Sequence, residues 1–336
     1  MKLAPQTKVL IVGASGLLGS HLARALTGRG IRPRCLVRPT SDRSRLAGIG
    51  DAEFVTGDVL DPASIAPHFG GIDVCFHVSG TVDMGRPRDE ADRLIAGGGR
   101  AVIDACRAHG VTKLVAVSTG ETIGVCRRPD DAADEARPFE PRNADLYFGG
   151  PYHRLEQAIA EAVAGGLDAC TVHLLYVMDA ADKTGLFRRI LRGKRAPTIA
   201  GGISLAWIDE VIAAMLAAAE RGGAGERYML AGENATWQDI FERVRRRGGR
   251  PGGVMRVPTA VARTVEWLHL GSPALREMLS YAGAFLYYDC AKARRELGYT
   301  AMPLDQIIER VFAGGGASLP EAPGPAPRPE SKRAAG

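Results

Sequence analysis

The 336-residue chain lacks several features that would narrow its class. Its six cysteines include no CxxC pair and no metal-ligand spacing, so neither a zinc site nor a disulfide framework is indicated. No apolar run approaches the length of a membrane span, and no signal peptide precedes the first apolar run. These absences predict a cytoplasmic protein with reduced cysteines, of which Cys35 and Cys75 lie in apolar runs and are expected to be buried.

The excess of one sign of charge is also small, because the chain has 43 basic and 38 acidic residues and a net charge of only +5. The arginines are scattered, so no nucleic-acid partner is indicated. The densest basic run, 243–250, lies where an expected helix ends on glycines and is interpreted as a solvated helix C-terminus favoured by the dipole. A hydrophobic content of 46% and a charged content of 24% are typical of a globular chain.

The chain opens on a strand, a glycine turn and a helix. Residues 9–12 are an apolar run typical of a strand buried on both faces of a parallel sheet. Gly13 permits a tight turn, Gly16 lets the backbone approach a pyrophosphate, and Gly19 packs the helix on the strand. A tight strand-to-helix turn without a ligand is the alternative. The pattern favours a dinucleotide site on the helix N-terminus, formed by Gly13, Ser15, Gly16, Leu17 and Leu18.

Strand and helix patterns then alternate as in a doubly wound α/β sheet. Further strands are expected at 34–38, 53–56, 73–78, 113–119 and 169–175, with helices at 93–109 and 152–164. Later helices are expected at 186–192, 210–219, 237–247 and 260–268. We predict a Rossmann-type parallel sheet domain over residues 1–175, with 203–230 returning to it. A small C-terminal α/β substrate lobe is expected over 176–202 and 231–313, followed by a disordered Pro/Gly/Ala-rich tail at 314–336.

The end of the second strand favours NADP(H) over NAD(H). An NAD site usually places a carboxylate about 20 residues beyond the glycines, whereas this chain has Arg38, with Arg43 and Arg45 close behind. A guanidinium complements a 2′-phosphate in charge and geometry, although the three could be only a surface cluster. Asp58, followed by Val59, comes after the third strand, where its carboxylate could accept from an adenine amino group or cap a helix.

These segments resemble the extended short-chain dehydrogenase/reductases of the NAD-dependent epimerase/dehydratase group. The resemblance spans about residues 8–312 and is carried by GASGLLG, LVRPTSDRSRL, GDVLDPAS, FHVSG, Ser118-Thr119 with Gly124 five residues on, and Tyr152. Within the group, AWIDEV and YYDCAKARRELGY are similar to hopanoid-associated sugar epimerases and to dihydroflavonol-reductase-like and 3β-hydroxysteroid dehydrogenase-like members. The resemblance implies a nicotinamide coenzyme beside Val78, Ser79 and Gly80. It also implies a homodimer in which the helices at 93–109 and 152–164 form a four-helix bundle.

The resemblance further implies catalysis by a hydroxyl residue, a tyrosine and a lysine. Thr119 would bond a substrate oxygen, and Tyr152 would act as general acid or base while a hydride moves to or from the nicotinamide. The lysine is absent, because Glu156 stands four residues after the tyrosine on the same helix face. A phenol titrates near pH 10, so a carboxylate at that place is expected to raise the Tyr152 pKa. The predicted catalytic set is Thr119, Tyr152 and Glu156, with an altered proton relay.

Two further segments depart from the family pattern. The asparagine-containing turn appears as AGGGR at 96–100, and the expected proline is missing from 174–178. Three functions therefore stay open. The first is an NADP(H)-dependent oxidoreductase or epimerase acting on a carbinol or ketone of a sugar, sterol or isoprenoid-type molecule. The second is a catalytically impaired NADP(H)-binding pseudoenzyme, sensor or scaffold, and the third is an enzyme using the nicotinamide for another reaction. The sequence determines neither the substrate nor the direction of hydride transfer.

Several aromatic and histidine residues have two interpretations. His77 lies beside the nicotinamide or is a core histidine. Trp267 and Leu268 either roof a hydrophobic substrate or belong to the core of the smaller lobe. The same ambiguity applies to Tyr281, Phe285, Tyr287 and Tyr288.

Overall fold

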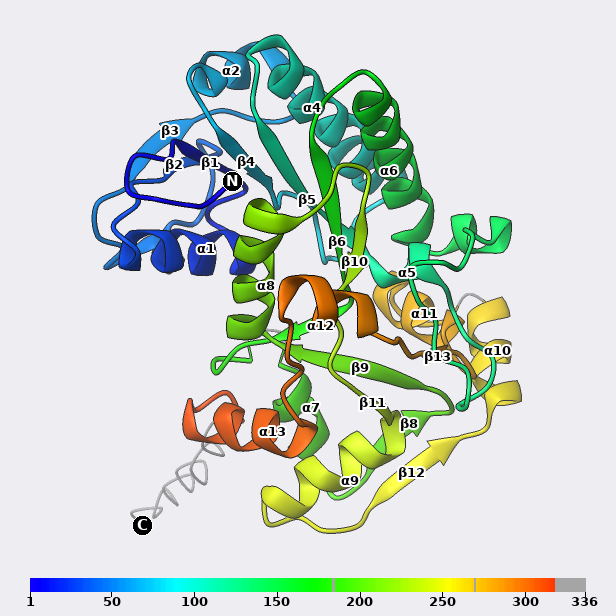
Figure 1. Cartoon of the computed structure of the whole chain (residues 1–336). Coiled ribbons are helices and arrows are strands. Elements are labelled where there is room, and N and C mark those ends of the chain that lie inside the picture. The colour runs from blue at the N-terminus through cyan, green and yellow to red at the C-terminus, as the bar shows by residue number, and fades with distance from the viewer. Residues whose placement is uncertain (183–184, 269, 318–336) are drawn as a thin grey trace, which may run out of the picture.

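A seven-stranded parallel sheet forms the larger part of the molecule (Figure 1). The computed structural model describes residues 1–182, 185–268 and 270–317. The strands run in the order β3-β2-β1-β4-β5-β6-β10, which confirms the predicted Rossmann-type fold. They are β1 (Val9–Val12), β2 (Arg34–Val37), β3 (Glu53–Thr56), β4 (Val74–His77), β5 (Lys113–Thr119), β6 (Ala169–Leu174) and β10 (Arg227–Met229). The order reverses between β1 and β4, where doubly wound sheets bind ligands outside the carboxyl ends of the strands.

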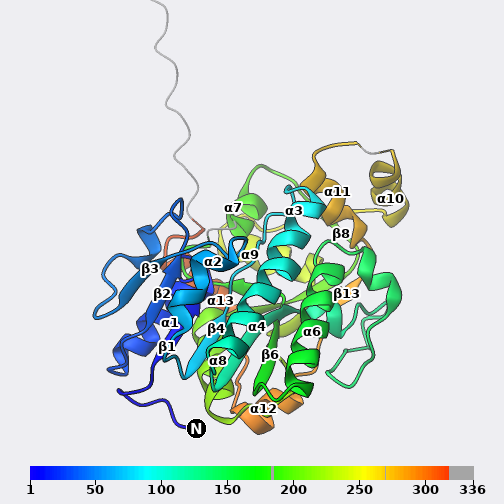
Figure 2. The same cartoon turned by 90° about the horizontal axis from the view of Figure 1, so that it is seen from above.

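Helices cover both faces of this sheet. On one face lie α1 (Leu17–Gly28) and α8 (Ile208–Arg221), and on the other lie α4 (Gly98–Ala108) and α6 (Gly149–Ala164), side by side in Figure 2. Residues 9 and 11 join the core under α1 and α8, whereas residues 10 and 12 join the core under α4 and α6. An all-apolar strand suits this position, because its successive side chains point to opposite, equally covered faces. Shorter helices on this half are α2 (Pro62–Ile65), α3 (Arg88–Asp92) and α5 (Gly120–Ile123).

The smaller lobe is built around β9 (Gly202–Trp207). This strand pairs in parallel with β7 (Tyr176–Met178) and β13 (Phe285–Leu286), and antiparallel with β11 (Glu233–Thr236). A separate parallel pair joins β8 (Ala196–Ile199) to β12 (Val254–Val257). The helices of this lobe are α7 (Leu186–Leu191), α9 (Trp237–Arg247), α10 (Thr259–Trp267), α11 (Pro273–Ser280), α12 (Ala291–Leu297) and α13 (Leu304–Ala313).

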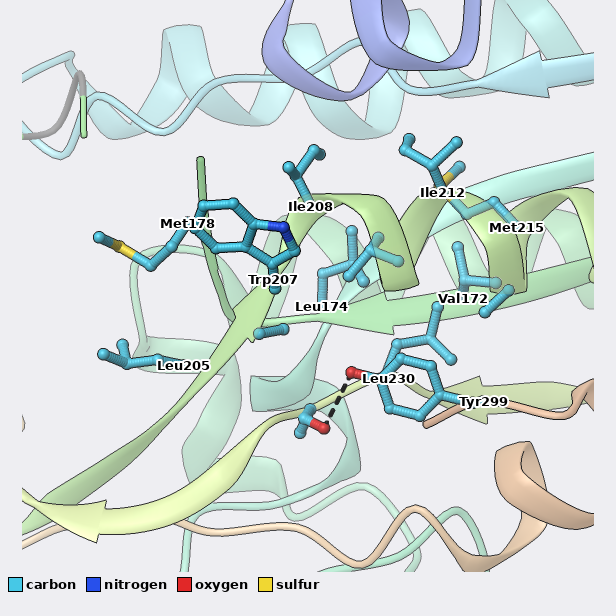
Figure 3. Close-up of a cluster of buried hydrophobic side chains, with 14 of the residues drawn as sticks. Val172, Leu174, Met178, Leu205, Trp207, Ile208, Ile212, Met215, Leu230 and Tyr299 are labelled. Carbon is cyan, nitrogen blue, oxygen red and sulfur yellow. Dashed lines mark hydrogen bonds between the residues drawn. The ribbon is translucent and has the colours of Figure 1, made fainter. Parts of the chain in front are cut away.

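One continuous apolar core joins the two lobes. It runs from Val172 on the large sheet, past Met215 on α8, to Trp207 at the end of β9 (Figure 3). Tyr299 lies in the same core, and its hydroxyl donates to the carbonyl oxygen of Ala231 at 3.0 Å. The smaller lobe is therefore held firmly against the large sheet.

Two sequence-based expectations are wrong. The helix expected from residue 93 begins at Arg88 as α3 and passes through a π-helical turn, Arg93–Gly97, before α4. Residues 314–317, expected in the disordered tail, are packed, because a Cβ on Gly314 would lie 2.5 Å from the Cβ of Ala180 and Ala317 is buried. The remainder of the expected tail, 318–336, lies outside the described residues.

Candidate functional site

The glycine turn after β1 has the geometry of an anion cradle. Gly13 has φ +97°, and a Cβ there would lie 2.8 Å from backbone atoms of Ser79. A Cβ on Gly19 would lie 2.6 Å from the Cα of Ala14, so α1 can pack on the turn only with glycine at this position. Gly16 is exposed and caps α1 without a side-chain hydrogen bond. The first N–H groups of α1, which begins at Leu17, are thus open to a phosphate.

The loop after β4 brings Tyr152 to this turn. The N–H of Val78 donates to the carbonyl oxygen of Val12 at 3.0 Å, and Ser79 lies against Gly13. A Cβ on Gly80 would lie 2.8 Å from the hydroxyl oxygen of Tyr152. The predicted coenzyme loop and the predicted acid–base tyrosine are therefore neighbours.

His77 is buried, as a core histidine would be, and it also adjoins the predicted coenzyme loop. Its Nδ1 lies 3.2 Å from the Oγ of Ser79, and its Nε2 has no hydrogen-bond partner among the residues that the structure describes. Burial lowers the pKa of His77 to about 4, so the ring is neutral at pH 7. A Cβ on Gly99 would lie 3.3 Å from Nε2, so the glycine run at 97–99 lets the helix approach the sheet beside this ring.

The arginines after β2 differ in their availability. Arg38 and Arg43 are exposed, and neither guanidinium bonds to a residue in the described ranges. The guanidinium of Arg45 instead lies 3.5 Å from the carboxylate of Asp179. Arg38 is thus the arginine at the predicted position that remains available to a 2′-phosphate.

The segment after β3 closes the same side of the site. The carboxylate of Asp58 accepts from the N–H of Leu60 at 3.0 Å and so orders its own loop. Val59 is buried in space that Gly98 leaves, because a Cβ on Gly98 would lie 2.6 Å from Val59 Cγ2. The AGGGR segment therefore fits close packing between α4 and this loop.

The two hydroxyl residues of the predicted catalytic set lie at the carboxyl edge of the sheet. Thr119 ends β5 and is buried, and its Oγ1 accepts from the N–H of Glu121 at 3.4 Å. Among the residues that the structure describes, none accepts the Thr119 hydroxyl hydrogen, which leaves it available to a ligand oxygen. Tyr152 is partly buried on α6, and its pKa is raised to about 12, first by burial and then by the carboxylate of Glu121. Tyr152 is therefore a neutral phenol at pH 7, able to donate a proton.

Glu156 lies apart from this pair, in a polar network against the sheet. Its Oε1 accepts from the hydroxyl of Ser118 on β5 and lies 3.6 Å from Nδ1 of His173 on β6. Its Oε2 lies 3.5 Å from the guanidinium of Arg227 on β10. The pKa of Tyr152 is raised as expected, but the cause is Glu121 and burial rather than Glu156.

Glu121 is the site residue that the sequence interpretation missed. It is buried, and its carboxylate accepts from the hydroxyl of Tyr281, the residue that follows α11, at 2.7 Å. A Cβ on Gly120 would lie 2.6 Å from the hydroxyl oxygen of Tyr288, so that tyrosine also borders the site. The sequence could have indicated this residue, because the glutamate of GETIGV comes directly after a strand that is expected to be buried.

The other aromatic candidates lie elsewhere. Phe285 and Tyr287 pack on each other, with ring centroids 5.3 Å apart. Trp267 and Leu268 do not belong to the core of the smaller lobe, because their side chains are 77% and 50% exposed.

Comparisons with known proteins agree with this geometry. A model described as the NAD dependent epimerase/dehydratase family matches residues 9–231. The 4-hydroxy-2-methyl-3-oxo-4-farnesyl-3,4-dihydroquinoline-1-oxide ketoreductase of Stigmatella aurantiaca is 28% identical over 333 residues, covering 92% of this chain and 98% of that protein. Sterol demethylase protein B of Methylococcus capsulatus is 29% identical over 263 residues, covering 74% of this chain and 77% of its own. The crystal structure of gox2253 has a TM-score of 0.82 at 28% identity, covering 92% of this chain and 98% of that chain.

Proposed function

The chain belongs to the NAD dependent epimerase/dehydratase family, and we propose that it uses NADPH to reduce a ketone of a sterol- or isoprenoid-type small molecule. It is an NAD(P)-dependent oxidoreductase or epimerase of the extended short-chain dehydrogenase/reductase type. The observation that supports the reductive direction is the neutral phenol of Tyr152, which has Glu121 rather than a cation among the charges acting on it. A protonated phenol is the form that a carbonyl reduction needs, whereas alcohol oxidation needs the phenolate.

The glycine turn would bind the coenzyme, and Tyr152 and Thr119 act on the substrate oxygen. The turn at Gly13–Gly16 and the N-terminus of α1 would hold the pyrophosphate, and the coenzyme, once bound, supplies a hydride. The exposed Gly16, where a Cβ would meet only the carbonyl oxygen of Gly13, at 3.3 Å, leaves the turn open to such a group. Tyr152 donates its hydroxyl proton to the carbonyl oxygen as that oxygen gains charge. Thr119 donates a hydrogen bond to the same oxygen and orients it.

The substrate class is proposed from the relatives and from the walls of the site. The ketoreductase and the sterol demethylase protein named above both carry names that denote isoprenoid-derived or sterol chemistry. The smaller lobe contributes Tyr281 and Tyr288, whose rings offer apolar area with one polar end each. Both features favour a ring ketone over a nucleotide sugar.

The proposed reaction is tested by following NADPH absorbance with purified protein. A sterol ketone and an isoprenoid-substituted ring ketone are expected to be reduced, and a nucleotide sugar is expected to be inert. Coenzyme binding by fluorescence, measured on the same sample, separates an inactive coenzyme-binding protein from one that fails to bind. Binding without oxidation by any ketone would favour the pseudoenzyme or sensor.

Arg38→Ser is expected to weaken NADPH binding about tenfold and to leave NADH binding unchanged. A charge-assisted hydrogen bond contributes about 1.5–3 kcal/mol, and only NADPH carries the 2′-phosphate that Arg38 would meet. Titration of intrinsic fluorescence with each coenzyme measures both constants. Arg45→Ser is the matched control and should change the NADPH constant less, because that guanidinium already faces Asp179. Equal losses for both coenzymes would contradict the preference.

Glu121→Gln is expected to shift the pH profile of alcohol oxidation to lower pH. The pKa of Tyr152 is raised to about 12 by burial and by the Glu121 charge, so removing that charge lowers the pKa. The phenolate then forms at lower pH, and the oxidation rate below that pKa rises. Glutamine still offers an oxygen to Tyr281. Glu156→Gln is the matched control, which should leave the profile in place, and an equal shift in both variants would refute the assignment.

Oligomeric state and location are also proposals. We propose a homodimer through the outward sides of α4 and α6, where Arg100 and Glu161 pair across the two helices at 2.9 Å. Light scattering of the purified chain tests it. We propose a cytoplasmic location, because all six cysteines are free and buried, which fits a reducing compartment.

A further inference from the structure

The exposed apolar side chains of the molecule gather on one helical hairpin. Six of the eleven exposed large apolar residues in the described ranges lie on α10, on α11 or between them. This apolar hairpin surface consists of Val261, Trp267, Leu268, Leu270, Leu275 and Met278. Exposed apolar residues are usually scattered singly over a protein surface, whereas a contiguous apolar patch marks a site that another protein or a membrane covers.

The hairpin carries both buried and exposed apolar residues. Its inner side packs through a small separate core of Ala262, Leu279 and Ala282. Val261 on α10 and Leu268, the residue that follows this helix, are both exposed.

A group of exposed cations lies in the segments that precede β8 and β12 and on β12 itself, the strand that leads into α10. This basic edge consists of Arg192, Lys194, Arg195, Arg246, Arg250 and Arg256, and no carboxylate of the described ranges pairs with any of them. β8 and β12 are paired so that Val254 lies beside Ala196, and the basic residues that precede each strand are therefore brought together. β12 then leads directly into α10 (Figure 1), so charge and apolar surface are continuous along the chain.

We propose that the apolar hairpin surface and the basic edge dock the protein on a membrane that contains anionic lipids. Exposed apolar residues beside unpaired cations are the combination that binds an anionic lipid interface. Trp267, 77% exposed, is the residue type that membrane interfaces favour. No helix in the described ranges is long and apolar enough to cross a bilayer, so the attachment is peripheral.

Two other occupants fit less well. A nucleic acid would use the basic edge but would leave Trp267 and Leu268 in water. A second copy docked by two-fold symmetry would place one basic edge near the other, with like charges opposed. The membrane also suits the position of the hairpin, because α11 is followed directly by Tyr281, which bonds Glu121 in the site. The docked face would therefore adjoin the proposed ketone site.

Vesicle flotation of the full chain tests this surface. Vesicles of phosphatidylcholine with phosphatidylglycerol are expected to bind the protein at least tenfold more tightly than phosphatidylcholine alone, and added salt should weaken binding. Tryptophan emission should shift to the blue on binding, because Trp267 is exposed while Trp207 is buried. Absence of flotation with the anionic vesicles overturns the proposal.

Matched variants separate the two parts of the surface. Trp267→Ser with Leu268→Ser should reduce binding at least tenfold, and so should Lys194→Glu with Arg195→Glu, the latter on anionic vesicles only. Leu60→Ser and Arg107→Glu, at exposed sites elsewhere, should bind as the natural chain does. Equal losses in these controls overturn the proposal. The proposal is also overturned if the chain forms a dimer that Trp267→Ser dissociates, or if duplex DNA competes with the vesicles for binding. Vesicle binding needs neither coenzyme nor ketone, so it succeeds or fails independently of the proposed reaction.

Discussion

Tyr152→Phe is expected to slow NADPH-dependent ketone reduction roughly 10²–10⁴-fold and to leave the affinity for NADPH unchanged. The substitution removes the one hydroxyl that we propose donates a proton to the substrate, and loss of a general acid costs a factor of this size. The ring can keep its place, because the Tyr152 hydroxyl bonds to no residue in the described ranges and only meets the space beside Gly80. Steady-state kinetics with the best ketone, together with a coenzyme titration, measure both quantities.

Tyr147→Phe is the matched control for this loss. Its hydroxyl lies 2.8 Å from the carbonyl oxygens of both Asp83 and Arg86, to which its single hydrogen can donate, and so serves the loop rather than the proposed reaction. We expect a lower thermal stability and a rate within about tenfold of the natural chain, since each neutral hydrogen bond contributes roughly 1 kcal/mol. A Tyr152→Phe variant as active as Tyr147→Phe would mean that water supplies the proton.

The large sheet was predictable because its signals are local. An apolar run, three spaced glycines and an amphipathic helix occupy residues 9–28, so short-range pattern alone determines β1, the turn and α1. The strands β2 to β6 were predicted to within one residue at either end for the same reason. The smaller lobe was less predictable, because β9 pairs with β11 and β13 across long stretches of chain. Its helices α11, α12 and α13 did not stand out from the sequence.

The site divides along the same line. Gly13, Gly16 and Arg38 were predicted from their spacing, which the fold preserves locally. The surroundings of Glu121 could not be found, because Tyr281 reaches it from 160 positions away in the chain. A carboxylate flanked by apolar residues signals burial, but only the packed lobe identifies its partner. Sequence spacing likewise predicted the position of Glu156 on its helix, but it did not predict that the side chain contacts residues on β5, β6 and β10.

Glu156→Lys is expected to lower the melting temperature by about 4 °C rather than to raise the reaction rate. A lysine would place an ammonium where Oε2 now lies 3.5 Å from the guanidinium of Arg227, and it offers no acceptor to the hydroxyl of Ser118. Breaking a buried ion pair costs about 3–5 kcal/mol. The lower figure applies, since Arg227 is 27% exposed. In a chain of this size, about 3 kcal/mol corresponds to a shift of several degrees, which thermal unfolding measures.

A double-mutant cycle tests whether the charge pair itself is responsible. Glu156→Gln keeps an acceptor for Ser118 and should cost less than the lysine variant. Adding Arg227→Glu to Glu156→Lys reverses the pair and should recover part of the lost stability, whereas two independent sites would add their losses. A lysine variant that is as stable as the natural chain and reduces ketones faster would show instead that a missing cation limits the reaction. The expected result follows from the electrostatics of the sheet: with Arg227 fixed on β10, position 156 favours an anion, so a relay lysine requires changes on two elements.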